Sequence, residues 1–290
     1  MTDNRRFRTA VGENEVRHSY EALIAKHIPD VVRRTVPTSI GPVATLTTGP
    51  ESGTPVVLLH GSGATALSWA PVLLRLSDQY RLHAIDLPGE AGASTPTRVP
   101  FVAEEQARWL AEVHRELVDR PAVFVGVSVG GWIATALAVH EPQRVSRLVL
   151  QSASGFGPRK TFPLVLAGVL SMLGDRGRRQ ALAYLTGPRA DAGHRSMMQR
   201  DIDAFALRTF AHFVPRTDAL PEHDGADLAR IRAQITAAYG AEDRMLDASA
   251  AARKLRTTFP TATVDLRERV GHLIDDQATL TRQQLSAIIP

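Results

Sequence analysis

One six-residue segment, Gly-Val-Ser-Val-Gly-Gly at positions 126–131, restricts the possible folds of this chain more than any other. The apolar run before it, at 121–125, is typical of a buried strand, and the run after it, at 132–140, is typical of a helix. The pattern G-x-S-x-G between a strand and a helix predicts a tight turn that pushes the Ser128 hydroxyl out at the end of a sheet. Glycine suits this turn because strand and helix approach closely and the backbone is strained. The alternative is an ordinary turn that needs glycine only for packing.

Apolar runs with the pattern of strands alternate with helix-like runs along most of the chain. We expect strands at 31–36, 43–48, 55–59, 80–85, 122–125, 145–150, 234–239 and 262–266. We expect helices at 16–28, 67–76, 104–118, 132–139, 248–259 and 276–289. This alternation predicts an α/β fold with a mostly parallel central sheet and helices on both faces. Residues 155–225 have helix-like pieces and no convincing strand, which indicates an inserted helical cap on a core of residues 1–154 and 226–290.

The cap sequence carries apolar residues that form either an acyl or alcohol pocket over Ser128 or the core of the cap itself. They are Phe156, Phe162, Leu166, Leu170, Met172, Met197, Met198, Phe205, Phe210 and Phe213. The methionines among them are flexible, which suits an adaptable binding site.

Composition excludes several classes of function. The absence of cysteine rules out disulfides, thiolate metal sites and a cysteine nucleophile. The formal net charge is +4, but the arginines are scattered except for Arg176, Arg178 and Arg179, where no aromatic residue interleaves. We therefore expect a solvated helix end there and no nucleic-acid partner. The first residues lack a signal-peptide pattern, and the apolar segment at 162–173 is too short to span a bilayer, so we expect a cytoplasmic protein with no membrane partner.

A serine hydroxyl is a weak nucleophile that needs a base, and the base needs a group to orient it. Among the ten histidines, His272 stands apart because it follows Val270 and Gly271 in a loop just after the last predicted strand. From that loop its side chain can return to the end of the sheet, so we predict His272 as the base. The alternative is a loop histidine that faces water.

The orienting acid is expected at the carboxyl end of a strand that lies between the serine and the histidine. Asp243 lies four residues past the predicted strand at 234–239, and we predict it as the acid, with Glu242 and Asp247 as alternatives. Residues 151–154, after the preceding strand, contain no carboxylate, which favours Asp243. The alternative role for Asp243 is the N-cap of the helix that follows.

The order serine, acid, histidine is the chain order of α/β-hydrolases. The chain resembles the serine branch of the α/β-hydrolase superfamily over nearly everything outside the insertion. The motifs are Leu-Leu-His-Gly-Ser-Gly at 58–63, Asp-Leu-Pro-Gly at 86–89, the segment at 126–131, Gly-Ala-Glu-Asp at 240–243 and Gly-His at 271–272. It is most similar to small bacterial carboxylesterases, which often have an N-terminal helix, a Val-Pro-Thr segment, here at 36–38, and a D-x-x-G-[DE] turn, here at 86–90. A serine nucleophile argues against the dehalogenase and epoxide hydrolase branches.

The resemblance implies an oxyanion hole formed by the backbone N–H groups of Ser62 and Val129. It also implies that His60 braces the loop of Ser62 and that Asp86 has a structural role. The implied reaction is hydrolysis of small-molecule carboxylic esters through an acyl-enzyme, without a metal or another cofactor. A thioesterase, a lactonase, a C–C bond hydrolase and an acyltransferase are alternatives with the same triad. A ligand-binding protein without turnover is the alternative from another class.

Overall fold

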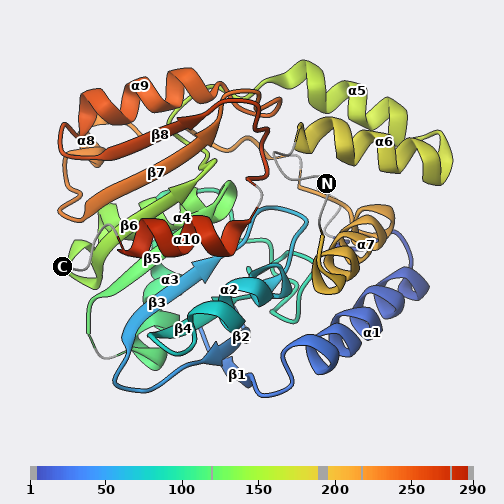
Figure 1. Ribbon diagram of the computed structural model, residues 1–290, viewed down its shortest axis with the longest axis horizontal. Helices are drawn as coiled ribbons and strands as arrows, with labels where there is room; N and C mark the ends of the chain where they lie inside the picture. The colour runs from blue at the N-terminus through green and yellow to red at the C-terminus, as the bar shows by residue number, and fades with distance from the viewer. Residues whose placement is uncertain (1–4, 119, 189–194, 217, 275, 287–290) are drawn as a thin grey trace.

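The computed structural model describes residues 5–118, 120–188, 195–216, 218–274 and 276–286. At its centre is one eight-stranded sheet with the order β1-β2-β4-β3-β5-β6-β7-β8 (Figure 1). The strands are β1 (Val32–Val36), β2 (Val43–Thr48), β3 (Thr54–Leu59), β4 (Tyr80–Ile85), β5 (Ala122–Val127), β6 (Val145–Gln151), β7 (Gln234–Gly240) and β8 (Thr263–Arg267). β2 pairs antiparallel with β1 and with β4, and every pair from β4 to β8 is parallel. The predicted mostly parallel sheet is confirmed.

Helices cover both faces of this sheet. They are α1 (Ala10–His27), α2 (Ala70–Leu76), α3 (Ala103–Leu117), α4 (Val129–His140), α5 (Thr161–Ser171), α6 (Gly174–Thr186), α7 (Met197–His212), α8 (Gly225–Leu228), α9 (Ala248–Thr258) and α10 (Gln277–Ser286), with 3-10 turns η1 (Ala66–Trp69) and η2 (Pro142–Arg144). One hydrophobic cluster joins α3, α4 and α9 to the sheet, and a second joins α1, α2 and α10 to it.

The strands β3 and β5 are apolar at almost every position because both of their faces are covered. Successive side chains of a strand point to opposite faces. In β3, Val57 and Leu59 belong to one cluster, whereas Val56 and Leu58 belong to the other. All six residues of β5 are buried. Strands buried on both sides read as continuous apolar runs, which is why the sequence pattern identified them.

The helices predicted at 16–28 and 67–76 differ from the observed ones for local reasons, and the helix predicted at 132–139 begins three residues earlier, at Val129. The helix expected at 16–28 begins earlier, at Ala10, because the hydroxyl of Thr9 accepts a hydrogen bond from the Gly12 N–H at 3.0 Å and caps it. The helix expected at 67–76 divides into η1 and α2. Its break falls beside Pro71, which lies in the first turn of α2, where a missing N–H costs no hydrogen bond.

Between β6 and β7 the described residues form α5, α6, α7 and α8, and no strand. Residues 189–194 and 217 of the predicted cap lie outside the described part of the chain, as does the predicted end of the closing helix at 287–289. α5 and α6 form a hairpin that extends beyond the sheet, at the upper right of Figure 1, whereas α7 packs on α1.

Candidate active site

Ser128 lies at the turn between β5 and α4, at the carboxyl edge of the parallel strands. Its backbone has φ 52° and ψ −115°, in the left-handed region that non-glycine residues rarely adopt. The turn is held from both sides, because the Ser128 N–H donates to the Gln151 carbonyl at 3.0 Å and the Ser128 carbonyl accepts from the Ser154 N–H at 3.1 Å. Strain that is held in this way is typical of functional turns.

Glycines beside Ser128 are required by packing. A Cβ on Gly126 would lie 2.5 Å from the carbonyl oxygen of Gly130, which no real side chain tolerates. A Cβ on Gly131 would lie 2.5 Å from the Cβ of Ala153, after β6. The packing explanation for these glycines therefore holds together with the strained serine, since the close approach is what forms the turn.

His272 and Asp243 lie together at the same edge of the sheet. Asp243 follows β7 and His272 follows β8, and the Nδ1 of His272 is 2.7 Å from the Oδ2 of Asp243. Both side chains are buried. The other oxygen of Asp243, Oδ1, accepts from the N–H groups of Met245 at 2.7 Å and Leu246 at 3.0 Å. An ionised carboxylate only accepts hydrogen bonds, so beside such a group the Nδ1 of His272 acts as the donor.

The two alternatives for the acid occupy other places. Asp247 caps α9, where its side chain accepts from the Ala250 N–H at 2.9 Å. Glu242 is exposed. Asp243 is therefore not the cap of α9. It lies beside Tyr239, and burial, together with the Asp243 charge, raises the pKa of Tyr239.

Ser128 and Asp243 follow strands that are not neighbours in the sheet. β5 and β7 have β6 between them, so their ends are about 10 Å apart. The Ser128 hydroxyl and the His272 ring, both in the described part of the chain, do not share a hydrogen bond. Catalytic hydrogen bonds are often long before substrate binds.

The loop after β3 lies beside Ser128. A Cβ on Gly61 would lie 3.5 Å from the Cβ of Ser128. His60 braces this loop, because its Nε2 accepts from the Leu87 N–H at 3.0 Å and its Nδ1 donates to the Gly61 carbonyl at 2.8 Å. In the described part of the chain, the backbone N–H groups of Ser62 and Val129 have no hydrogen-bond acceptor.

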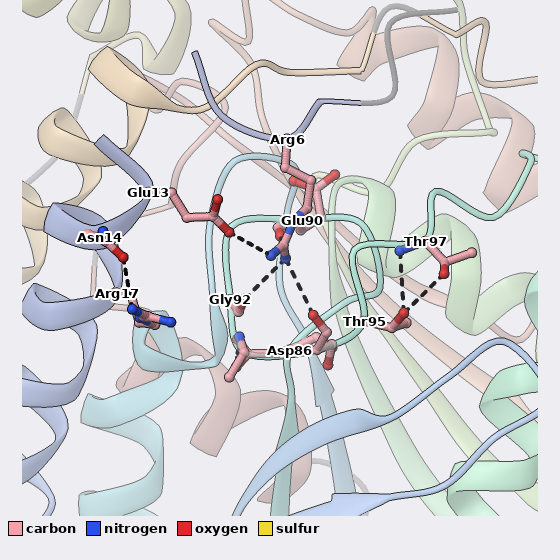
Figure 2. Close-up of polar contacts among 11 residues, drawn as sticks. Arg6, Glu13, Asn14, Arg17, Asp86, Glu90, Gly92, Thr95 and Thr97 are labelled. Atoms are coloured by element: carbon pink, nitrogen blue, oxygen red, sulfur yellow. Dashed lines mark hydrogen bonds and ion pairs between the residues drawn. The ribbon is translucent and has the colours of Figure 1, made fainter. Parts of the chain in front are cut away.

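Glu90 also holds this loop, and the sequence identified it only as part of a turn motif. Its buried carboxylate accepts from the Gly63 N–H at 2.7 Å and from the Ser62 hydroxyl at 3.3 Å. Figure 2 shows Arg6 reaching the loop of Glu90, where its guanidinium donates to the Glu90 carbonyl at 3.0 Å and to Glu13 at 3.3 Å. No local pattern could have paired Glu90 with residues 62–63.

Asp86 is structural, as the resemblance implied. Its buried carboxylate accepts from the Tyr20 hydroxyl at 2.7 Å, the Ala66 N–H at 2.7 Å and the Ala93 N–H at 3.0 Å. It therefore joins α1, the start of η1 and the loop that contains Glu90. Burial raises the pKa of Tyr20, so this phenol stays neutral and remains a donor.

Five of the ten apolar residues predicted for the cap pocket or cap core lie on the surface or in the protein core. Phe162, Met172 and Met197 are exposed. Phe205 and Phe213 belong to the core cluster that contains α1, and Phe213 packs edge-on against Phe7 with ring centroids 5.7 Å apart. These five side chains therefore serve as surface or as core.

The described residues hold neither a metal-binding cluster nor a membrane-spanning helix. No group of three or more histidine, aspartate or glutamate residues among them is arranged to hold a metal ion. None of their helices combines the length and the apolar character needed to cross a membrane.

The chain matches known proteins over most of its length. A family model described as alpha/beta hydrolase family matches residues 56–282. Carboxylesterase YbfK of Bacillus subtilis (strain 168) is 24% identical over 246 residues, which cover 82% of this chain and 81% of that protein. The crystal structure of carboxylesterase CesB (YbfK) from Bacillus subtilis has a TM-score of 0.81 and 19% identity, covering 97% of this chain and 99% of that chain. The crystal structure of naproxen esterase (carboxylesterase NP) from Bacillus subtilis has a TM-score of 0.80 and 19% identity, covering 100% and 99%. At these identities the structural matches show a common fold.

Proposed function

The chain belongs to the alpha/beta hydrolase family, and from that membership we propose that it hydrolyses carboxylic esters with a triad of Ser128, His272 and Asp243. The observation that carries this proposal is the 2.7 Å contact between His272 and Asp243 at the sheet edge where Ser128 occupies a strained turn. The relatives named as carboxylesterases support the choice of substrate.

The reaction proceeds by acyl transfer. His272 Nε2 takes the proton of the Ser128 hydroxyl as its oxygen attacks the ester carbonyl. Asp243 keeps the proton on Nδ1 and stabilises the imidazolium that forms. The tetrahedral intermediate then expels the alcohol, which receives its proton from His272. A water molecule attacks the acyl-enzyme in the same manner and releases the acid.

The N–H groups of Ser62 and Val129 act as the oxyanion hole. They have no acceptor among the described residues, and Val129 is the first residue of α4, where the helix dipole favours negative charge. A single donor of this kind contributes about 3 kcal/mol to transition-state stabilisation. Glu90 and His60 fix the loop that carries the Ser62 donor.

Residues 155–225 are assigned as a cap that is attached to the acid and base loops. The Lys160 ammonium donates to the Asp243 carbonyl at 2.7 Å, and the Gly271 N–H donates to the Pro188 carbonyl at 2.8 Å. The hairpin of α5 and α6 therefore begins beside one proposed triad residue and ends beside another.

The test compares Ser128→Ala with the wild type on short p-nitrophenyl esters and on a fluorophosphonate probe, which labels activated serines. Ser128→Ala should lose turnover and labelling, and so should His272→Ala. Ser249→Ala, which changes an exposed serine on α9, and His18→Ala, which changes an exposed histidine on α1, serve as matched controls and should keep both.

Equal turnover by the wild type and Ser128→Ala would refute the proposal. A substrate panel of thioesters, lactones and esters then distinguishes reactions that the same triad can perform. Labelling that persists in His272→Ala would refute the assignment of the base.

A further inference from the structure

Four large apolar side chains of α5 and its C-cap are exposed on the surface of the protein. Phe162, Val165, Val169 and Met172 are 72%, 65%, 55% and 85% exposed. Their spacing of three and four residues places them on one face of the helix or its C-terminal end. α5 contains no charged residue. Single exposed apolar residues are common, but a continuous apolar stripe marks an interaction surface.

This stripe is not used to pack the hairpin of α5 and α6. The side chains of the two helices that are described and buried are small, namely Ala167, Gly177, Ala181 and Thr186. At Gly177 a Cβ would overlap the carbonyl oxygen of Leu170, so the two helices approach closely. Leu166 and Leu170 are partly buried, whereas the four side chains of the stripe are left outside the contact between the two helices.

Basic residues adjoin the stripe. The first turns of α6 carry Arg176, Arg178 and Arg179, directly after the turn that links it to α5. Arg178 pairs with Asp175. Arg176 and Arg179 are exposed and form no salt bridge with a described residue. Residues 158–188 contain five basic and one acidic residue.

We propose that α5 and the turn into α6 form a docking surface for a membrane that contains anionic phospholipid. A membrane surface has an outer region of charged headgroups and an apolar region of acyl chains beneath it. An apolar helix face bordered by arginine fits both, because the apolar side chains enter the acyl region and the guanidinium groups bind the phosphates. α5 has 11 residues, so it is about 16 Å long and lies in the plane of the interface. This proposal departs from the expectation of no membrane partner, which was drawn from the lack of a segment long enough to span a bilayer.

Docking at this place bears on the site, on the assumption that the proposed esterase function holds. The hairpin is bonded to the loops of Asp243 and His272 through Lys160 and Pro188. A membrane bound at α5 therefore contacts a hairpin that is hydrogen-bonded to these loops. The substrate class that follows is esters of apolar acyl chains dissolved in that membrane.

The first experiment measures flotation with vesicles and uses full-length Ser128→Ala protein, so that hydrolysis leaves the lipids unchanged. Vesicles of phosphatidylcholine with about 30% phosphatidylglycerol should bind the protein about tenfold more tightly than pure phosphatidylcholine. The additional changes Phe162→Ser and Met172→Ser should weaken binding about tenfold. Val11→Ser, which removes a similarly exposed side chain from α1, should not weaken it. Arg176→Gln with Arg179→Gln should reduce the salt dependence of binding.

Three results would overturn the docking proposal. The first is no binding to the mixed vesicles at low salt, and the second is an equal loss with Val11→Ser. The third is a stable dimer that Phe162→Ser dissociates, since the stripe would then be an interface between copies of this chain.

The second experiment separates docking from catalysis. In protein with Ser128 intact, Phe162→Ser with Met172→Ser should lower turnover of a long-chain p-nitrophenyl ester in mixed vesicles about tenfold and leave turnover of soluble p-nitrophenyl butyrate unchanged. An equal loss on both substrates would contradict the substrate class. Turnover that survives Ser128→Ala would refute the proposed function, while the vesicle binding measured above would still decide the docking surface.

Discussion

Asp243→Asn is the substitution that tests the proposed triad most directly. The Asp243 carboxylate faces three donors: His272 Nδ1 on one oxygen, and the N–H groups of Met245 and Leu246 on the other. An asparagine has one acceptor oxygen and one amide nitrogen that only donates. Either His272 Nδ1 or the two backbone N–H groups must therefore meet the amide nitrogen, which is a donor, in place of a carboxylate oxygen.

The arrangement of lower free energy keeps the asparagine oxygen on the two backbone N–H groups, because turning the amide nitrogen toward them would lose two buried hydrogen bonds. The amide nitrogen then donates to His272 Nδ1. The imidazole proton moves to Nε2, which can then no longer accept the proton of the serine. We expect kcat to fall about 10⁴-fold, which corresponds to about 5 kcal/mol of transition-state stabilisation.

The assay is steady-state hydrolysis of p-nitrophenyl butyrate, corrected for the rate of Ser128→Ala, together with thermal unfolding of each variant. Asp247→Asn is the matched control, because the same change four residues away leaves an equally good N-cap for α9. Glu242→Gln removes an exposed charge from the same loop. Both should keep wild-type turnover.

A kcat within tenfold of the wild type, in an Asp243→Asn protein that unfolds at the wild-type temperature, would refute the assignment of the acid. An equal loss in Asp247→Asn would attribute the effect to the loop as a whole.

Further predictions concern stability and the oxyanion loop. Burial lowers the pKa of His83 and of His223 to about 4, so between pH 6.5 and 4 these histidines bind protons in the unfolded chain but not in the folded chain. Stability should be full above pH 6.5 and fall as the pH drops, by about 3 kcal/mol for each histidine below pH 4; urea unfolding should show a weaker pH dependence in His83→Gln, and an unchanged one would contradict this. Gly126→Ala should lower the free energy of unfolding by about 1–3 kcal/mol because of overlap at the Ser128 turn, whereas Gly168→Ala, on α5 with open space around it, should not, and equal melting temperatures would refute the packing argument. Glu90→Gln should lower kcat about tenfold with little change in KM, because it weakens a charged hydrogen bond to the oxyanion loop; a change confined to KM would exclude this positioning role.

Local patterns in the sequence predicted most of the fold. Strands buried on both faces give apolar runs, as in β5, and helices that cover them repeat their apolar residues every three to four positions, as in α3. The boundaries of β4 and β2 match the predicted ones to the residue. The same local rules located Ser128, because a strained strand-to-helix turn has its own short motif. The start of α1 was missed because its capping residue, Thr9, lies outside the apolar pattern.

Contacts between distant segments needed the folded chain. The sequence favoured Asp243 as the acid but left Glu242 and Asp247 as alternatives, and the arrangement of β7 beside β8 places Asp243 against His272. Glu90 is joined to residues 62–63 through the pairing of β3 with β4, and no short-range pattern encodes that pairing.

The outward stripe on α5 illustrates the same division. The apolar composition of α5 can be read from the sequence. Which face of α5 packs depends on its close contact with α6 at Gly177. Periodicity and turn chemistry depend on residues a few positions apart, so an ordered list of amino acids contains them. Strand order, burial and the meeting of side chains depend on the whole packed arrangement, because each is set by segments that the chain brings together from far apart.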